Sequence, residues 1–235
     1  MNLPEPHRRL LEDVATAGTP YALALAGGYA LQAHGLIDRP HRNVDFATQS
    51  AEPMETVAGA VRTALEARGR LVRPGSLTPL SAQLAVTDPP TGETFDLALH
   101  KEALWHPPVL TEHGPALSLE DAVGTKVRAL YDRGAAVDLI DARAAGARFS
   151  RQDLEELGRR HAHDVFDLPT LQSRLTGTDW YPDAEFTAYG LAEDGIGALR
   201  VWAQQWSDDI AERLLEDGAS PDTDTEPGQD TTGDC

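Results

Sequence analysis

The sequence predicts an α+β fold, in which a mixed β-sheet with flanking helices is followed by a helical second half. Residues 81–87 and 94–100 alternate apolar and polar side chains, as strands with one buried face do. The turn Asp88-Pro89-Pro90-Thr91-Gly92 joins them into an antiparallel hairpin. From Ser118 onward the apolar residues instead follow helical spacing.

Each element of the first half has a local signal. Leu10, Leu11 and Val14 form the apolar face of an amphipathic helix, and Gly35 and Gly69 end two further helices. The segment Tyr21–Ala26 is either a short apolar strand or the turn into the next helix. In order, the predicted elements are helix Pro4–Ala17, the segment Tyr21–Ala26, helix Gly28–His34, strand Val44–Thr48, helix Glu52–Arg68, and strands Leu71–Arg73, Ser81–Thr87 and Thr94–His100.

The second half is predicted to be helical throughout its ordered part. Ser118, followed by Asp121, is interpreted as the N-cap of a helix. Trp202 and Trp206 fall on one stripe and are interpreted as core residues. His161 and His163 are expected at the surface. The predicted division is an α/β core over residues 1–117, a helical part over 118–215 that completes a cleft, and an acidic, disordered tail over 216–235.

Composition limits the possible functions. The formal net charge is −18, of which seven negative charges lie in residues 216–235, so the remaining −11 argues against a broad, non-specific grip on nucleic acid. Arg39, His41 and Arg42 form a local basic patch. The lone cysteine is the last residue, which excludes an internal disulfide. With neither a membrane-spanning apolar run nor a signal-peptide pattern, a cytoplasmic enzyme without membrane contact is expected.

The segment Ala26–Thr48 carries the strongest chemical signal. Gly27 and Gly28 follow an apolar run and begin a helical segment, which suits backbone N–H groups that approach phosphate. Asn43 and Asp45 are two residues apart on a predicted strand, so their oxygens point to the same face. Oxygen ligands suit Mg²⁺ or Mn²⁺, although Asn43 is a neutral ligand where such a site usually has a second acid.

Asp96 supplies a third candidate ligand. On its strand, Phe95, Leu97 and Leu99 face one way, while Asp96 and Ala98 face the other. If this strand and the one that holds Asn43 and Asp45 are neighbours, the three polar side chains converge. The alternative is that Asp96 lies on a solvated face of the sheet.

Lys126 is unusual because the chain has only two lysines beside 18 arginines. It lies beside an apolar helical stripe, so its ammonium must either reach solvent along the helix edge or point into a cleft, where it would suit a triphosphate. Asp138 and Asp141 are three residues apart on the next predicted helix and share one side. Arg133, in the turn between the helices, either binds phosphate or caps the first helix.

Together, Gly27-Gly28, Arg42-Asn43-Val44-Asp45 and the segment Leu119–Asp141 resemble the minimal nucleotidyltransferases. More narrowly, they are similar to the AbiEii/AbiGii-type nucleotidyltransferase-like proteins, many of which are toxins of toxin–antitoxin pairs. The resemblance implies a nucleotidyltransferase-like sheet, with Lys126 on one helix and Asp138 on the next. Asp138 would orient Lys126 or help to deprotonate the acceptor. Val137 departs from the family, which commonly has a basic residue there.

By this resemblance the catalytic residues would be Asp45, Asp96, Lys126 and Asp138. Gly27, Gly28, Arg42 and Lys126 would bind the nucleotide, and Asn43, Asp45 and Asp96 would hold Mg²⁺ or Mn²⁺. The expected reaction transfers a nucleoside monophosphate from an NTP to a hydroxyl of RNA (tRNA), of a protein or of a small molecule, and a cognate antitoxin is an expected partner. The alternative is a degenerate, non-catalytic module that binds a nucleotide or a partner. Asn43 leaves open whether the protein is a one-metal enzyme or a binder without turnover.

Overall fold

The structure is a computed structural model that describes residues 4–39, 41 and 43–219. Within these residues a seven-stranded sheet has the order β3-β4-β5-β2-β1-β7-β6. The strands are β1 (Ala24–Leu25), β2 (Asn43–Thr48), β3 (Leu71–Leu77), β4 (Ser81–Asp88), β5 (Glu93–Lys101), β6 (Val109–Thr111) and β7 (Gly114–Ala116). The pairs β2–β5 and β1–β7 are parallel and the other neighbours are antiparallel, so the sheet is mixed as predicted.

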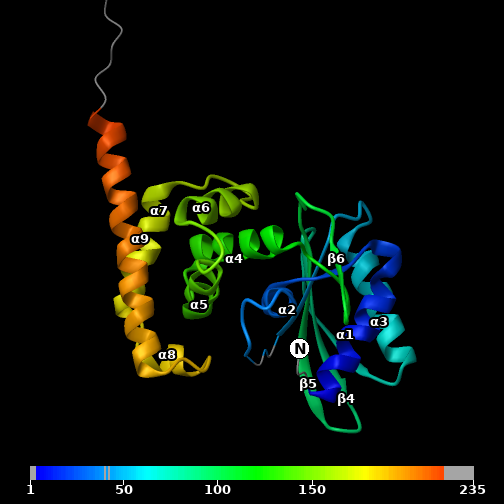
Figure 1. Cartoon of the computed structure of the whole chain (residues 1–235). Helices are drawn as coiled ribbons and strands as arrows, with labels where there is room; N and C mark the ends of the chain where they lie inside the picture. The colour runs from blue at the N-terminus through cyan, green and yellow to red at the C-terminus, as the bar shows by residue number, and fades with distance from the viewer. Residues whose placement is uncertain (1–3, 40, 42, 220–235) are drawn as a thin grey trace, which may run out of the picture.

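Helices cover both faces of this sheet (Figure 1). One face is covered by α1 and α3, and α2 and the helical half lie on the other side. The helices and 3₁₀ turns of the described chain are α1 (Glu5–Gly18), η1 (Thr19–Tyr21), α2 (Gly27–Ala33), α3 (Met54–Ala67), α4 (Leu119–Arg133), α5 (Ala136–Ala145), α6 (Arg151–Arg160), α7 (Leu168–Thr176), η2 (Gly177–Trp180), α8 (Asp183–Thr187) and α9 (Glu193–Ala219).

Most predicted elements of the first half are present within a few residues of their expected bounds. The alternation in β4 and β5 buries Leu84, Val86, Phe95, Leu97 and Leu99. The predicted hairpin is confirmed by the antiparallel register of these two strands. Two strands went unpredicted: β6 and β7 are three residues each, too short to show alternation.

The helical half follows its local signals. The Ser118 hydroxyl accepts a hydrogen bond from the Asp121 backbone N–H at 3.0 Å, which confirms the predicted N-cap of α4. Gly134 ends α4 with φ of +63°, a conformation that favours glycine. Trp206 is fully buried, as its stripe predicted. Helix α9 continues to Ala219, so residues 216–219, which were assigned to the tail, are helical; residues 220–235 lie outside the described chain.

Two apolar cores hold the molecule together. The first lies between the sheet and the helices α1 and α3. The second includes Ala26, Ala30, Leu31 and Ala47 from the N-terminal half, packed in one cluster with the helical half. The helical half is therefore anchored on α2 and the nearby strands, beside the predicted nucleotide-binding segment.

Candidate functional site

Strands β2 and β5 bring the predicted oxygen ligands to one region of the sheet. They are parallel neighbours, and Asn43 is in register with Asp96, while Asp45 is in register with Ala98. Val44 and Phe46 are fully buried, whereas Asn43 and Asp96 are exposed and Asp45 is half-buried. The condition set by the sequence, that the two strands be neighbours with their polar residues on one face, is met.

The glycine pair is required by close contacts with two side chains. Gly27 has φ of +58°, and a Cβ at this position would lie 2.2 Å from Asp45 Oδ2. A Cβ at Gly28 would lie 2.3 Å from His41 Cε1. Both glycines therefore make room for side chains of the neighbouring segment. The expected contact between their N–H groups and phosphate stays a prediction.

Asp45 lies among cationic groups. His100 Nε2 is 3.8 Å from its Oδ1. Burial alone would raise the pKa of the Asp45 carboxyl, but interactions with His100, Lys126 and Arg133 outweigh burial and place this pKa below its usual value. Asp45 is thus held as a carboxylate, the form that binds a hard cation.

The carboxylate beside Lys126 is Asp141, which corrects one expectation. Lys126 Nζ lies 2.8 Å from Asp141 Oδ2, and Arg39 Nη2 donates to Asp141 Oδ1 at 2.6 Å. Asp138 instead accepts two hydrogen bonds from Arg133, at 2.7 and 2.8 Å. The prediction that Asp138 orients Lys126 is wrong, because the packing of α5 on α4 turns Asp141 toward the lysine and Asp138 toward the end of α4.

A cavity of about 910 Å³ lies beside these charged residues. Asn43 and Asp45 line it from β2, Lys126 and Arg133 from α4, and residues 187–191 from the end of α8 and the chain that follows. Gly28 also lines the cavity, whereas Asp96 and the buried Asp138 lie outside its wall. Arg42, predicted to bind the nucleotide, is outside the described residues.

Arg39, His41 and Tyr189 are parts of the cavity wall that the sequence did not assign to the site. The Arg39 guanidinium lies over the Tyr189 ring, 5.4 Å from its centroid, and bonds to both Asp141 and His41. Burial and the charge of Arg39 lower the pKa of His41 to about 4. The basic patch before Asn43 was a signal for Arg39 and His41, but the segment with Tyr189 carries no motif.

The fold of this chain is similar to that of known proteins, although its sequence is not. No protein-family model matches the chain, and no curated protein sequence matches it. Solved structures do. JHP933 from Helicobacter pylori matches with a TM-score of 0.52 at 19% identity, over 93% of this chain and 99% of that one. A candidate nucleotidyltransferase from H. pylori matches with a TM-score of 0.56 at 18% identity, over 90% of this chain and 99% of that one. MenT4, a nucleotidyltransferase toxin from Mycobacterium tuberculosis H37Rv, matches with a TM-score of 0.56 at 14% identity, over 89% of this chain and 91% of that one.

The chain has a nucleotidyltransferase fold. The matches cover nearly the whole of each chain, so they include both the sheet and the helical half. At these identities the likeness establishes the fold, and the nucleotidyltransferase-like architecture predicted from the sequence is confirmed. The cavity lies where the two halves of this fold meet, between β2 and the helices α4 and α5.

The cavity of this nucleotidyltransferase fold has oxygen donors that suit one divalent cation, with the remaining ligands supplied by a substrate and by water. Within residues 4–39, 41 and 43–219, no three His, Cys, Asp or Glu side chains gather closely enough to hold a metal ion. Asp45 supplies a carboxylate and Asn43 a neutral carbonyl oxygen on the same strand face. Mg²⁺ is commonly held by one or two carboxylates with phosphate oxygens and waters, so this donor set fits it.

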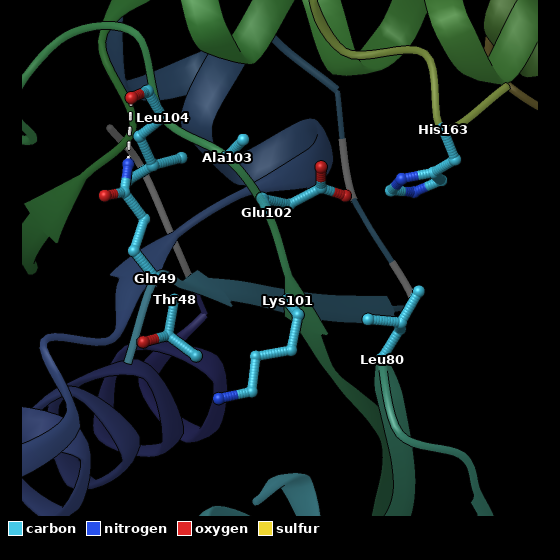
Figure 2. Close-up of a pocket in the computed structure, with 8 residues that line it drawn as sticks. All are labelled: Thr48, Gln49, Leu80, Lys101, Glu102, Ala103, Leu104 and His163. Atoms are coloured by element: carbon cyan, nitrogen blue, oxygen red, sulfur yellow. Dashed lines mark hydrogen bonds between the residues drawn. The ribbon is translucent and has the colours of Figure 1, made fainter. Parts of the chain in front are cut away.

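A second cavity, of about 410 Å³, lies at the other end of β5 (Figure 2). Lys101 lines it, and its ammonium donates to the backbone carbonyls of Ser50 and Glu52. Glu102 also lines it, with its carboxylate pointing toward His163 in Figure 2. Both Glu102 oxygens accept hydrogen bonds from Arg128, each at 2.8 Å.

A buried charge network extends from Glu102. His161, expected at the surface, is 4% exposed and lies 3.1 Å from Asp121 and 3.9 Å from Glu102. Burial alone would raise the pKa of Glu102, but His161 and Arg128 lower it to about 2. Burial alone would lower the pKa of His161, but Asp121 and Glu102 raise it. The network joins the end of β5 to α4 and to the end of α6.

None of the described helices is both long enough and apolar enough to span a membrane.

Proposed function

We propose that this protein is a magnesium-dependent nucleotidyltransferase that transfers a nucleoside monophosphate from an NTP to a hydroxyl group. The observation that carries the proposal is the cavity in a nucleotidyltransferase fold where Asp45, Asn43 and Lys126 face one space. A cavity of about 910 Å³ has the size of small-molecule sites in proteins. The AbiEii-type assignment, with an RNA (tRNA), protein or small-molecule acceptor and a cognate antitoxin, belongs to this proposal and rests on the sequence resemblance.

In the proposed reaction the acceptor oxygen bonds to the α-phosphorus, the bond to the β-phosphate oxygen breaks, and pyrophosphate leaves. Magnesium, when bound, neutralises charge on the phosphate oxygens. Asp45 and Asn43 would hold the ion, and Asp96 would add a carboxylate from the neighbouring strand. Lys126 has three N–H donors, and only part of this capacity is used by Asp141, so the ammonium is available to the triphosphate. Asp138 is fully buried outside the cavity wall and both of its oxygens bind Arg133, so the proton of the acceptor hydroxyl would pass to water and not to Asp138.

A second function is favoured by one observation, namely that Asn43 occupies the place of an acid. With one charged ligand lining the cavity from β2, the protein would bind a nucleotide or a partner without turnover. Both functions require nucleotide or metal contacts in the same cavity, and they differ in whether transfer occurs.

Removing the Lys126 ammonium is expected to weaken magnesium-dependent NTP binding by about tenfold to hundredfold, as for loss of a hydrogen bond to a charged group. Isothermal titration calorimetry with each of the four NTPs checks this for wild type and Lys126→Ala. The matched control is Lys101→Ala, the other lysine, which lines the second cavity in Figure 2 and should leave the affinity unchanged. If no NTP binds the wild type at millimolar concentration, nucleotidyl transfer and nucleotide binding are both excluded.

Asn43→Asp is expected to tighten Mg²⁺ or Mn²⁺ binding, because each added carboxylate strengthens a site for a hard cation. If the wild type is a slow or one-metal enzyme, transfer of labelled nucleotide to an acceptor should also rise. If the fold is a degenerate binder, the metal should bind more tightly while transfer stays at zero. Gln152→Glu, which adds the same charge on an exposed position of α6, is the control. A wild type that turns over rapidly and is slowed by Asn43→Asp contradicts both versions.

A further inference from the structure

Arg133 is not needed to cap α4, which is one of the two roles that the sequence left open for it. The Arg174 guanidinium donates hydrogen bonds to the backbone carbonyls of Tyr131 and Asp132, both at 2.9 Å. Gly134 ends the helix in the left-handed conformation that glycine favours. The last turn of α4 therefore has its capping contacts without the Arg133 side chain, and the other role, a phosphate contact, is open to it.

The guanidinium of Arg133 is fixed by a buried carboxylate. Its Nε and Nη2 donate to the two oxygens of Asp138, at 2.7 and 2.8 Å, and Asp138 is fully buried. Two parallel hydrogen bonds of this kind hold the plane of the guanidinium in one orientation. They use two of the five N–H donors of arginine, and Nη1 has no hydrogen-bond partner in the part of the chain that the structure describes.

The donors that Asp138 leaves free are accessible to a ligand. The Arg133 side chain is 61% exposed and lines the large cavity, whereas Asp138 lies outside the cavity wall. Lys126 lines the same cavity, and it precedes Arg133 by seven residues on α4. A spacing of seven residues places two side chains on the same face of a helix, two turns apart. One face of α4 therefore presents two cationic groups to one cavity.

We propose that Arg133 binds the phosphate chain of the nucleotide through its free N–H donors, and that Asp138 is the positioning residue that holds the guanidinium for this contact. The inference rests on the proposed function, because it adds a second cationic contact for the same triphosphate. A phosphate group suits the site since it accepts charge-assisted hydrogen bonds from a guanidinium. The contact with Asp138 orders the arginine before the ligand arrives, which lowers the entropy cost of binding.

The test removes the phosphate contact without leaving a buried charge unpaired. The double variant Arg133→Gln/Asp138→Asn loses both members of the ion pair. Calorimetry should show that it binds magnesium-NTP and inorganic tripolyphosphate about tenfold to hundredfold more weakly than wild type does. Arg133→Lys keeps the counter-charge of Asp138 but lacks the fork that reaches carboxylate and phosphate together, so both probes should bind about twofold to tenfold more weakly.

Two further variants separate phosphate binding from a purely structural role. Arg174→Gln removes the guanidinium that caps the same helix, so it should lower the urea midpoint of unfolding and leave the affinity for both probes unchanged. Asp138→Asn leaves the exposed Arg133 in place without its anchor, and it should weaken tripolyphosphate binding by about twofold to tenfold. Wild-type affinity in Asp138→Asn would refute its positioning role. Urea unfolding checks that each variant is folded.

Failure of this inference and failure of the proposed function give different results. If the wild type and the double variant bind magnesium-NTP and tripolyphosphate equally well, the inference is overturned and the proposed function stands. If tripolyphosphate binding depends on Arg133 but no NTP binds, the proposed function is removed and the phosphate site is kept. If Arg174→Gln weakens binding as much as the double variant does, the effect comes from the end of α4, and the inference is overturned. The same holds if the double variant loses affinity only for single-stranded RNA, which would assign Arg133 to the acceptor.

Discussion

Asp45→Asn is expected to abolish metal-dependent nucleotide binding and transfer while the protein stays folded. Asp45 is the carboxylate that lines the cavity from β2, and it is kept ionised by His100, Lys126 and Arg133 despite its burial. Outer-shell partners of a metal typically contribute about tenfold to hundredfold, so loss of a direct ligand should exceed about hundredfold. Asparagine keeps the shape of the side chain beside Gly27, where there is no room for rearrangement.

Asp96→Asn is expected to act in the same direction, because Asp96 lies beside Asn43 on the same face of the sheet. The control is Glu93→Gln, an exposed acid on the same strand whose side chain faces the other way. Equilibrium dialysis of Mn²⁺ with and without NTP measures the effect, and circular dichroism checks the fold. Wild-type metal-dependent binding in Asp45→Asn would show that the cavity holds its ligand without this carboxylate, and the same result for Asp96→Asn would return that residue to the solvated face.

Glu102→Gln is expected to lower the free energy of unfolding at pH 6 by about 3 kcal/mol or more, the typical cost of leaving a buried partner charge uncompensated. The carboxylate is 6% exposed and binds Arg128 through both oxygens, so its loss removes the buried counter-charge of this guanidinium and leaves His161 with Asp121 alone. Urea unfolding followed by circular dichroism measures the change. Glu156→Gln breaks half-exposed pairs with Arg159 and Arg160 and should cost less than about 1 kcal/mol.

The difference in stability between wild type and Glu102→Gln should depend on pH. The pKa of Glu102 is about 2, below its ordinary value of 4.5, so its contribution is present above pH 4.5 and is lost as the pH falls from 4.5 toward 2. The stability difference between wild type and Glu102→Gln should therefore shrink over this range. His161 has a raised pKa, so its contribution is present below pH 6.5 and is lost as the pH rises through the raised value. A difference that stays constant from pH 6 to pH 3 would contradict the network.

The parts of the fold that the sequence predicted are those set by short-range pattern. Alternation in residues 81–87 and 94–100 predicted β4, β5 and their hairpin, because a strand with one buried face must repeat every second residue. The N-cap at Ser118 was visible because its mechanism involves only the next few residues. The strands β6 and β7 were missed because three residues show no period, and β7 contains Gly114 and Pro115, which usually mark turns.

The candidate site was only partly predictable because its contacts come from packing between helices and loops. Helical spacing placed Asp138 and Asp141 on one side of α5, but the choice between them as partner of Lys126 depends on the angle at which α5 crosses α4. The burial of His161 also depends on tertiary packing. Its sequence surroundings suggested a surface position, but its partners Asp121 and Glu102 lie 40 and 59 positions away in the sequence. The cavity wall at residues 187–191 likewise comes from tertiary structure alone.

The apolar core shared by the two halves bears on how this protein could be divided. Ala26, Ala30, Leu31 and Ala47 belong to the same cluster as the helical half, so a cut after residue 117 would separate secondary-structure types and not folding units. A fragment that ended there would keep Asn43, Asp45 and Asp96, yet it would expose an apolar surface to water next to them. The wall that carries Asn43 and Asp45 and the wall that carries Lys126 should therefore behave as one cooperative structure, whose halves melt together and are degraded together by proteases.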